Sequence, residues 1–389
     1  MKSLSFLLTE YFVIFLIFVF LGNKPVVGQE FHKYKNTVFN AGENQIDSYR
    51  IPSLITTKDG NLLAFSEARK SSSTDKTPTD IVVKRSTDNG KTWSKMQFLT
   101  HGEEDAFMDP VALVDEVTGK IFLFANRWPE KDHSMKGNTA WLITSTDEGL
   151  SWSGPKNMTD EITATGHFMN GFGPGSGIQM QGKKFKNRLI LPTRQYDGKI
   201  LRNRTVYSDD HGETWKIGGA ASIGGEFEIA ETPKDTLIFN LRAGNGERKK
   251  AWSFDGGVFW TDAIVDKQLE TTADYGGCQS SILGIDNLLF FTGPAGGTTD
   301  DMHEDRQNFK FYRSLDGGKT WPHSLLLFGN AAGYSDITLL KNGDLAIIFE
   351  TADTEGFPKM IPGNRPPGWM RIDVIVLSGN FLQENYWIR

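Results

Sequence analysis

The chain contains 389 residues, of which 38% are hydrophobic, 12% aromatic and 23% charged, and its formal net charge is −6 at pH 7. That length suits one large all-β domain or two smaller domains. The mildly acidic balance argues against nucleic acid or an anionic membrane as the main partner. Cys278 is the single cysteine, so an intramolecular disulfide is excluded, and we expect this residue to be a small buried apolar side chain.

The first segment in chain order is an apolar leader. Lys2 precedes an apolar run from Tyr11 to Leu21, and a small residue, Gly28, follows it. The run is too short to span a bilayer comfortably, and Glu10 interrupts its N-terminal side. We therefore predict a signal peptide over residues 1–28, a secreted or periplasmic protein, and no stable membrane insertion after cleavage. An uncleaved membrane anchor is the alternative.

Residues 29–389 are predicted to form short strands separated by turns in one domain. Apolar runs alternate with Gly, Asp and Asn throughout this region; examples are NLLAFSEAR at 61–69, KIFLFANR at 120–127, DTLIFNLR at 235–242 and DLAIIFE at 344–350. Each run is β-prone, and no amphipathic helix of convincing length intervenes. The pattern predicts an all-β fold.

One short pattern, Ser-x-Asp-x-Gly-x-x-Trp, occurs five times, beginning at Ser86, Ser145, Ser208, Ser253 and Ser314. Its Asp can accept backbone N–H groups of its own turn, its Gly can adopt positive φ, and its Trp can pack against the sheet. The intervals of 59, 63, 45 and 61 residues indicate a repeated unit of about 60 residues, and residues 30–389 hold six such units. We predict a six-bladed β-propeller of four-stranded antiparallel blades, closed by one blade that lacks the turn or uses both termini.

Four arginines near strand ends are candidates for a ligand site. A single arginine in such a place is usually a surface or salt-bridged residue, so the flanking motifs matter. The four are Arg50 in SYRIPSL, Arg69 in AFSEAR, Arg242 in IFNLR and Arg306 in EDRQNF.

The repeats resemble the Asp-boxes of the sialidase (neuraminidase) superfamily, and the chain as a whole is similar to a bacterial-type exo-α-sialidase. The motifs that carry this resemblance are YRIP at 49–52, EAR at 67–69, DKTPTDIVVKRSTDNGKTW at 75–93, FGPGSGIQM at 172–180, GGCQSSIL at 276–283 and GYSDITLLKNGDLAIIFE at 333–350. The resemblance covers essentially the whole chain after the leader. It implies a retaining glycoside hydrolase that removes terminal sialic acids from glycoproteins, glycolipids or oligosaccharides through a tyrosyl-glycosyl intermediate.

By this resemblance, Arg50, Arg242 and Arg306 bind the carboxylate of the sugar. The assignment agrees with the chemistry, because a guanidinium is a fixed fork of donors that suits a planar anion in a partly desolvated site.

The resemblance also assigns three catalytic residues. Tyr334 is the nucleophile, and Glu226 is the base that accepts its proton. A tyrosine avoids the repulsion that a carboxylate nucleophile would meet from the carboxylate on the reacting carbon. Asp75 is the general acid that protonates the leaving oxygen and then the base that activates water.

Three further residues are expected to support the site. Arg69 and Asp109 would reach sugar hydroxyls around the 4-position, and Glu350 would hold Arg50. Glu350 could instead be a strand-end surface charge, and Asp109 a turn residue before Pro110.

We expect no metal and no cofactor, since His133, His167 and His211 do not have a metal-ligand spacing.

Alternative functions remain open at this point. The same catalytic residues would serve a related 2-ulosonic acid, such as deaminated sialic acid or Kdo, and the segment ATGHFMNGFGPG at 164–175 is less aromatic than an N-acetyl pocket is expected to be. A non-catalytic glycan-binding Asp-box propeller is the alternative from another class. The presence of Asp75, Glu226, Tyr334 and all three arginines in this chain favours a catalytic protein.

Overall fold

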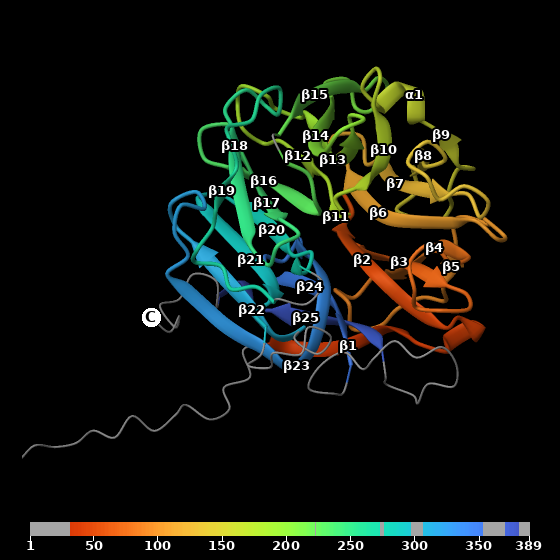
Figure 1. The fold of residues 1–389 in the computed structure, drawn as a ribbon. Helices are drawn as coiled ribbons and strands as arrows, with labels where there is room; N and C mark the ends of the chain where they lie inside the picture. The colour runs from red at the N-terminus through yellow and green to blue at the C-terminus, as the bar shows by residue number, and fades with distance from the viewer. Residues whose placement is uncertain (1–31, 222, 273–275, 297–305, 353–369, 381–389) are drawn as a thin grey trace, which may run out of the picture. The chain divides into compact units, whose positions relative to one another are not determined.

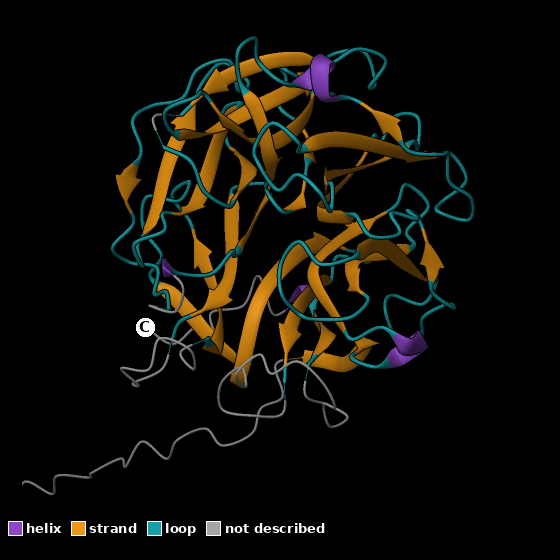
Figure 2. Cartoon of the chain, turned by 45° about the vertical axis from the view of Figure 1, so that its right-hand side comes forward, coloured by secondary structure: helices purple, strands orange, loops and turns teal. Residues whose placement is uncertain are grey.

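The computed structural model describes residues 32–380 except 222, 273–275, 297–305 and 353–369. The chain divides into two compact units, Met1–Glu30 and Phe31–Arg389, and every described residue belongs to the second. The predicted signal peptide therefore lies outside the described residues. Strands dominate the described chain (Figure 2), which confirms the all-β prediction. The helical segments among these residues are short; they include α1 (Thr159–Ile162) and a 3-10 turn at Glu43–Gln45.

The first half of the chain forms two antiparallel sets of four strands that share one sheet. The first set is β2 (Ser48–Thr56), β3 (Leu62–Arg69), β4 (Thr79–Ser86) and β5 (Gln97–Phe98). The second is β6 (Ala106–Val114), β7 (Ile121–Trp128), β8 (Thr139–Ser145) and β9 (Lys156–Asn157). A short parallel contact between β4 and β6 joins the two sets.

Two separate sheets follow, each with a core of four antiparallel strands. One contains β10 (Phe168–Phe172), β13 (Leu189–Tyr196), β14 (Leu201–Ser208) and β15 (Lys216–Ala220). The short strands β11 (Gly175–Ser176) and β12 (Ile178–Gln179) pair with β6 and β13. The other sheet contains β16 (Phe227–Thr232), β17 (Thr236–Arg242), β18 (Arg248–Ser253) and β19 (Ile264–Val265).

The last sheet joins the two ends of the described chain. Its strands are β20 (Ser281–Ile285), β21 (Leu288–Pro294), β22 (Gln307–Ser314), β23 (His323–Leu339), β24 (Leu345–Thr351), β25 (Arg371–Leu377) and β1 (His32–Asn40). The long strand β23 pairs with β22 through its first part and with β24 through its second. Because β1 pairs with β25, the N-terminal strand completes the C-terminal set.

Each Ser-x-Asp-x-Gly-x-x-Trp segment forms the same hydrogen-bonded turn. In the second copy, Gly149 N donates to Ser145 Oγ at 3.0 Å, and Ser151 N and Oγ donate to Asp147 at 2.9 and 2.5 Å. The two backbone N–H bonds have equivalents in the copies that begin at Ser86, Ser208, Ser253 and Ser314. These turns carry no residue of the predicted site, so their role is structural.

The turns also fasten neighbouring strand sets to one another. Trp215 of the third copy packs edge-on against Phe122 of β7, with ring centroids 5.7 Å apart. Gly212 in the same turn has φ +79°, and a Cβ there would lie 2.2 Å from the Phe122 ring. Glycine is therefore required both for the turn conformation and for the close approach.

First strands of neighbouring sets contact one another: β2 contacts β6 and β23, β6 contacts β10, and β20 contacts β16 and β23. These strands lie toward a common centre (Figure 1). Bulges interrupt β2 between Arg50 and Ser53, β6 between Met108 and Val111, and β23 between Ala332 and Ser335. Ile51 and Asp109, at the first two bulges, have φ values of +56° and +53°. Strained bulges of this kind re-aim side chains and concentrate at functional sites.

Candidate active site

Tyr334, on the second part of β23, lies at the centre of a buried polar cluster. Its hydroxyl donates a short hydrogen bond to Glu226 Oε1, and Glu226 directly precedes β16. Arg242, the last residue of β17, donates from Nη1 to Glu226 Oε2 at 2.7 Å and to Tyr334 Oη at 3.1 Å. The sheets thus bring together three residues that are far apart in the sequence.

Two more arginines face the ring of Tyr334. The guanidinium carbons of Arg50 and Arg306 lie 5.5 and 5.7 Å from the ring centroid. Arg50 makes a bidentate pair with Glu350, at 3.1 and 3.2 Å, and Glu350 also accepts the backbone N–H of Tyr334 at 3.2 Å. Arg306 donates to the Gly277 carbonyl at 3.2 Å. The three arginines therefore surround one tyrosine, with Glu350 joining Arg50 to it.

The charges around Tyr334 determine where its proton resides. Burial, followed by the negative charge of Glu226, raises the pKa of Tyr334 well above its usual value. Burial also works to raise the pKa of Glu226, but the charges of Arg242 and Arg194 outweigh it and hold that pKa below its usual value. The resting state is therefore a neutral phenol donating to an ionised carboxylate.

Asp75 lies in the loop between β3 and β4, with 70% of its side chain exposed. Its Oδ1 is 2.9 Å from Arg69 Nη1. Partial desolvation works to raise the pKa of Asp75, but the charges of Arg69, Arg50 and Arg306 outweigh it and hold the pKa below its usual value. Without a ligand, Asp75 is therefore an ionised carboxylate.

Arg69 is more enclosed than the sequence suggests. Its side chain is 0% exposed, and it donates to Glu67 Oε2 at 2.7 and 2.9 Å and to the Ser73 carbonyl at 2.5 Å. Asp75 lies on its remaining side. In this arrangement Arg69 does not reach solvent, so contact with a sugar hydroxyl requires Asp75 to move.

Asp109 pairs with a residue that the sequence analysis did not identify, Arg194. Arg194 Nη2 donates a short bond to Asp109 Oδ2, and Arg194 Nε donates to the Phe172 carbonyl at 2.8 Å. Burial raises the pKa of Asp109 even though Arg194 opposes the shift. The sequence did contain a signal for Arg194, because it follows an apolar run near the end of β13, much as Arg69 and Arg242 follow apolar runs at the ends of β3 and β17.

Cys278 packs with Ile51 and Tyr334 in a small buried cluster. Burial raises the pKa of the Cys278 thiol to about 11, so the thiol stays protonated and is a packing group. Among the described residues, no group of His, Cys, Asp and Glu is arranged to hold a metal ion, and no helix is long and apolar enough to cross a bilayer.

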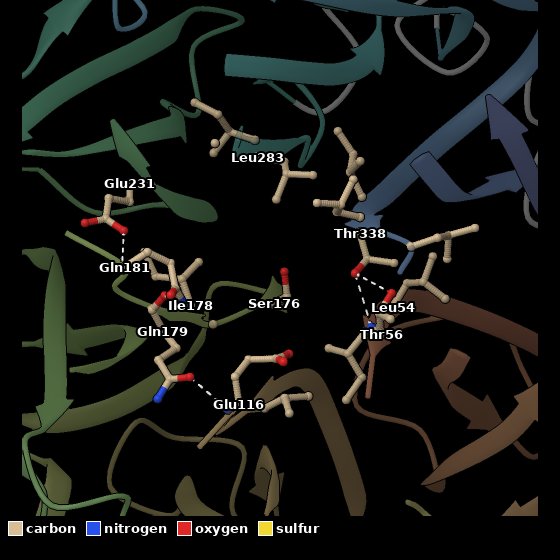
Figure 3. Close-up of a pocket in the computed structure, with 18 of the residues that line it drawn as sticks. Leu54, Thr56, Glu116, Ser176, Ile178, Gln179, Gln181, Glu231, Leu283 and Thr338 are labelled. Atoms are coloured by element: carbon tan, nitrogen blue, oxygen red, sulfur yellow. Dashed lines mark hydrogen bonds between the residues drawn. The ribbon is translucent and has the colours of Figure 1, made fainter. Parts of the chain in front are cut away.

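A hollow of about 600 Å³, shown in Figure 3, is lined in part by the ends of β2, β6 and β16 that lie away from Arg50, Asp109 and Glu226. Its lining includes Leu54, Thr56, Glu116, Ser176, Gln179, Glu231, Leu283 and Thr338. Glu231 lies near the end of β16 that is farther from Glu226. Its carboxylate accepts hydrogen bonds from the backbone N–H groups of Gln181 and Gly182. The hollow is therefore distinct from the site around Tyr334.

Comparisons with known proteins identify the family of this chain. A model of the BNR repeat-like domain family matches residues 60–347. The chain is 32% identical over 358 residues to a sialidase of Bacteroides fragilis, an alignment that covers 82% of this chain and 63% of that protein. It is 30% identical over 348 residues to sialidase-2 of Cricetulus griseus, covering 79% of this chain and 88% of that protein. The chain belongs to the sialidase family.

Among solved structures, this sialidase-family chain is similar to the Hadza microbial sialidase Hz136, with a TM-score of 0.75 and 28% identity over 88% of this chain and 68% of that one. The chain spans somewhat less than two thirds of the B. fragilis sialidase. The matched family region contains Asp75, Glu226 and Tyr334, whereas Arg50 and Glu350 lie just outside it. Strand pairing brings both of the outer residues to the cluster.

Proposed function

We propose that this protein is an exo-α-sialidase that hydrolyses terminal sialic acids with retention, using Tyr334 as nucleophile. The observation that carries the proposal is the hydrogen bond from Tyr334 to Glu226 inside a ring of three arginines. A cluster of arginines around a phenol that is hydrogen-bonded to a carboxylate base suits a sugar whose reacting carbon bears a carboxylate.

In the first step, the sugar carboxylate pairs with Arg50, Arg242 and Arg306, which places the anomeric carbon next to Tyr334 Oη. The phenol proton passes to Glu226 as the oxygen attacks that carbon. The bond to the leaving oxygen breaks, and Asp75 supplies the proton that this oxygen takes up.

In the second step, Asp75 is a carboxylate again and removes a proton from water. The water oxygen attacks the anomeric carbon and displaces Tyr334, which recovers its proton from Glu226. Two inversions give net retention.

Substrate binding prepares Asp75 for its role as an acid. In the free protein, the arginines keep the pKa of Asp75 low. A sugar carboxylate bound to Arg50 and Arg306 cancels part of their charge, and this raises the pKa of Asp75. The acid therefore takes up its proton mainly when substrate is present.

A related 2-ulosonic acid, deaminated sialic acid or Kdo, is the second candidate substrate, and one observation favours it. Gly171, in the segment where the N-acetyl pocket is expected, lies against the Asp109–Arg194 pair: a Cβ at Gly171 would be 2.5 Å from Asp109 Oδ2 and 2.6 Å from Arg194 Nη2. A charged wall there is better suited to a hydroxyl than to an acetyl methyl group.

We also propose that the sheets close as a six-bladed propeller, with β1 completing the last blade. The pairing of β1 with β25, the four-stranded antiparallel sets and the repeated turns support this. The apolar leader supports a signal peptide over residues 1–28 and a secreted or periplasmic location. The partners that follow from the proposed activity are sialylated glycans.

The test is hydrolysis of fluorogenic glycosides of N-acetylneuraminic acid, deaminated sialic acid and Kdo by wild type and Tyr334→Phe. We expect turnover of at least one glycoside, release of the α-anomer first by NMR, and near-complete loss in Tyr334→Phe. Binding of sialyllactose without turnover of any glycoside would instead support the non-catalytic alternative.

A further inference from the structure

The loop that carries Asp75 is fastened to the neighbouring strand set by Lys76. Lys76 Nζ lies 3.6 Å from the centroid of the Trp128 ring and donates to the His133 carbonyl at 3.3 Å. Trp128 ends β7, whereas Asp75 and Lys76 lie between β3 and β4. A cation over the face of an indole is attracted to the ring, so this contact bridges two sets of strands.

The backbone at Lys76 is strained. Its φ is +61°, in the left-handed region that costs energy for a residue with a Cβ. The nearby bonds of the loop tip are internal: Thr74 N donates to Ser72 Oγ at 3.2 Å, and Thr77 Oγ1 donates to the Thr74 carbonyl at 3.0 Å. Such bonds shape the tip of the loop but do not attach it to the neighbouring set of strands. Lys76 makes that attachment.

Trp128 is a rigid anchor for this contact. It is 4% exposed and packs with Ala106, Met108 and Met135. The Asn126 amide is oriented so that both its oxygen and its nitrogen form hydrogen bonds. The Asn126 oxygen accepts from Trp128 Nε1 at 2.7 Å, and the Asn126 nitrogen donates to Asp109 Oδ2 at 3.0 Å. Asn126 therefore holds both the Trp128 ring and the Asp109 carboxylate.

We propose that Lys76 is a positioning residue that holds Asp75 where it can protonate the leaving oxygen. The inference rests on the proposed function, in which Asp75 is the general acid. When the contact with Trp128 is removed, a smaller share of molecules has the acid in place. A cation–π contact of ordinary strength corresponds to a loss of up to about tenfold in that share.

The test compares two leaving groups in Lys76→Met, which keeps the apolar stem and removes the charge. We expect kcat/KM for sialyllactose to fall about tenfold, and kcat/KM for a 4-methylumbelliferyl glycoside to fall less than about twofold, because an activated phenol leaves without a proton. Lys76→Arg should keep most of the activity, since a guanidinium also stacks on indole. Lys184→Met is the matched control: Lys184 Nζ lies 4.7 Å from the Phe185 ring, away from the tyrosine cluster.

A double-mutant cycle separates this inference from the proposed function. In an Asp75→Ala background, Lys76→Met should cause no further loss, because Lys76 acts only through Asp75. An undiminished loss in that background, an equal loss on both substrates, or no loss at all would overturn the positioning role while leaving Asp75 as the acid. If Asp75→Ala itself affected the two substrates equally, Asp75 would not be the general acid, and the positioning role of Lys76 would be rejected as well. Melting curves identify any variant that fails to fold.

Discussion

At the scale of single residues, the site combines a buried phenol with an excess of positive charge. Arg242 contacts both Glu226 and Tyr334, and its charge helps to keep the Glu226 carboxylate ionised. The guanidinium groups of Arg50 and Arg306 face the Tyr334 ring, with their carbons 5.5 and 5.7 Å from its centroid. The three arginines thus surround Tyr334 from its hydroxyl and from its ring.

Replacing Arg242 with lysine should reduce kcat/KM for a sialoside by about 10- to 100-fold, because a point charge cannot bond Glu226, Tyr334 and a ligand carboxylate together. Steady-state kinetics measures the loss. Arg188→Lys is the control, since Arg188 pairs with Asp209 at 2.7 Å and lies 4.1 Å from the centroid of the Tyr207 ring, away from the cluster around Tyr334. An unchanged kcat/KM in Arg242→Lys would remove Arg242 from the anion site.

The low pKa of Asp75 predicts a particular pH dependence. The decrease of kcat/KM at higher pH reports the pKa of the acid in the free protein. The decrease of kcat at higher pH reports its pKa in the complex with substrate. Because the bound carboxylate raises the pKa of Asp75, the kcat limb should lie at higher pH than the kcat/KM limb, and KM for sialyllactose should rise with pH between them. Coincident limbs in the two profiles would show that binding leaves Asp75 unchanged.

At the scale of elements, the repeated turn is a local structure that attaches neighbouring sets of strands. The copy that begins at Ser253 departs from the rest: Phe259, which is 75% exposed, occupies the position where the other copies have a hydroxyl that bonds the turn Asp. Asp255 therefore accepts backbone N–H groups alone, at 2.8 and 3.1 Å, at this end of the turn.

This difference predicts unequal effects of removing the turn Asp. Asp147→Ala loses bonds from Ser145, Ser151 N and Ser151 Oγ, and should lower the free energy of unfolding by about 1–3 kcal/mol. Asp255→Ala should lower it less. Urea unfolding measures both, and KM should stay unchanged in each variant. A larger effect of Asp255→Ala would contradict the proposed importance of the hydroxyl bond.

At the scale of the whole molecule, stability depends on joining the two ends of the described chain. Phe39 of β1 is fully buried and stacks on Tyr49 of β2, with centroids 5.2 Å apart. The same core cluster includes Ile348 of β24 and Val374 of β25. The N-terminal strand thus contributes to the core that holds β2, and β2 carries Arg50.

Phe39→Ala should therefore destabilise the protein by about 3–5 kcal/mol, the usual cost of removing a buried aromatic ring. Thermal unfolding measures the effect, and Phe98→Ala is the control because Phe98 is 38% exposed. A Phe39→Ala variant as stable as wild type would show that β1 is dispensable for closure.

The sequence by itself determined the features that depend on near neighbours. Each turn needs only a Ser, an Asp and a Gly within five residues, so its hydrogen bonds were predictable from the pattern. The short apolar runs indicated strands for the same reason, because alternation and β-propensity act locally. Family motifs then indicated Asp75, Glu226 and Tyr334 as candidates, and the structure brings Glu226 and Tyr334 into contact.

The tertiary structure alone decided how residues from distant strands meet. Arg194 reaches Asp109 across 85 residues, and Lys76 reaches Trp128 across two strand sets. Such contacts depend on the order of the sheets and on the bulges that re-aim the central strands, and neither is encoded in the periodicity of one segment.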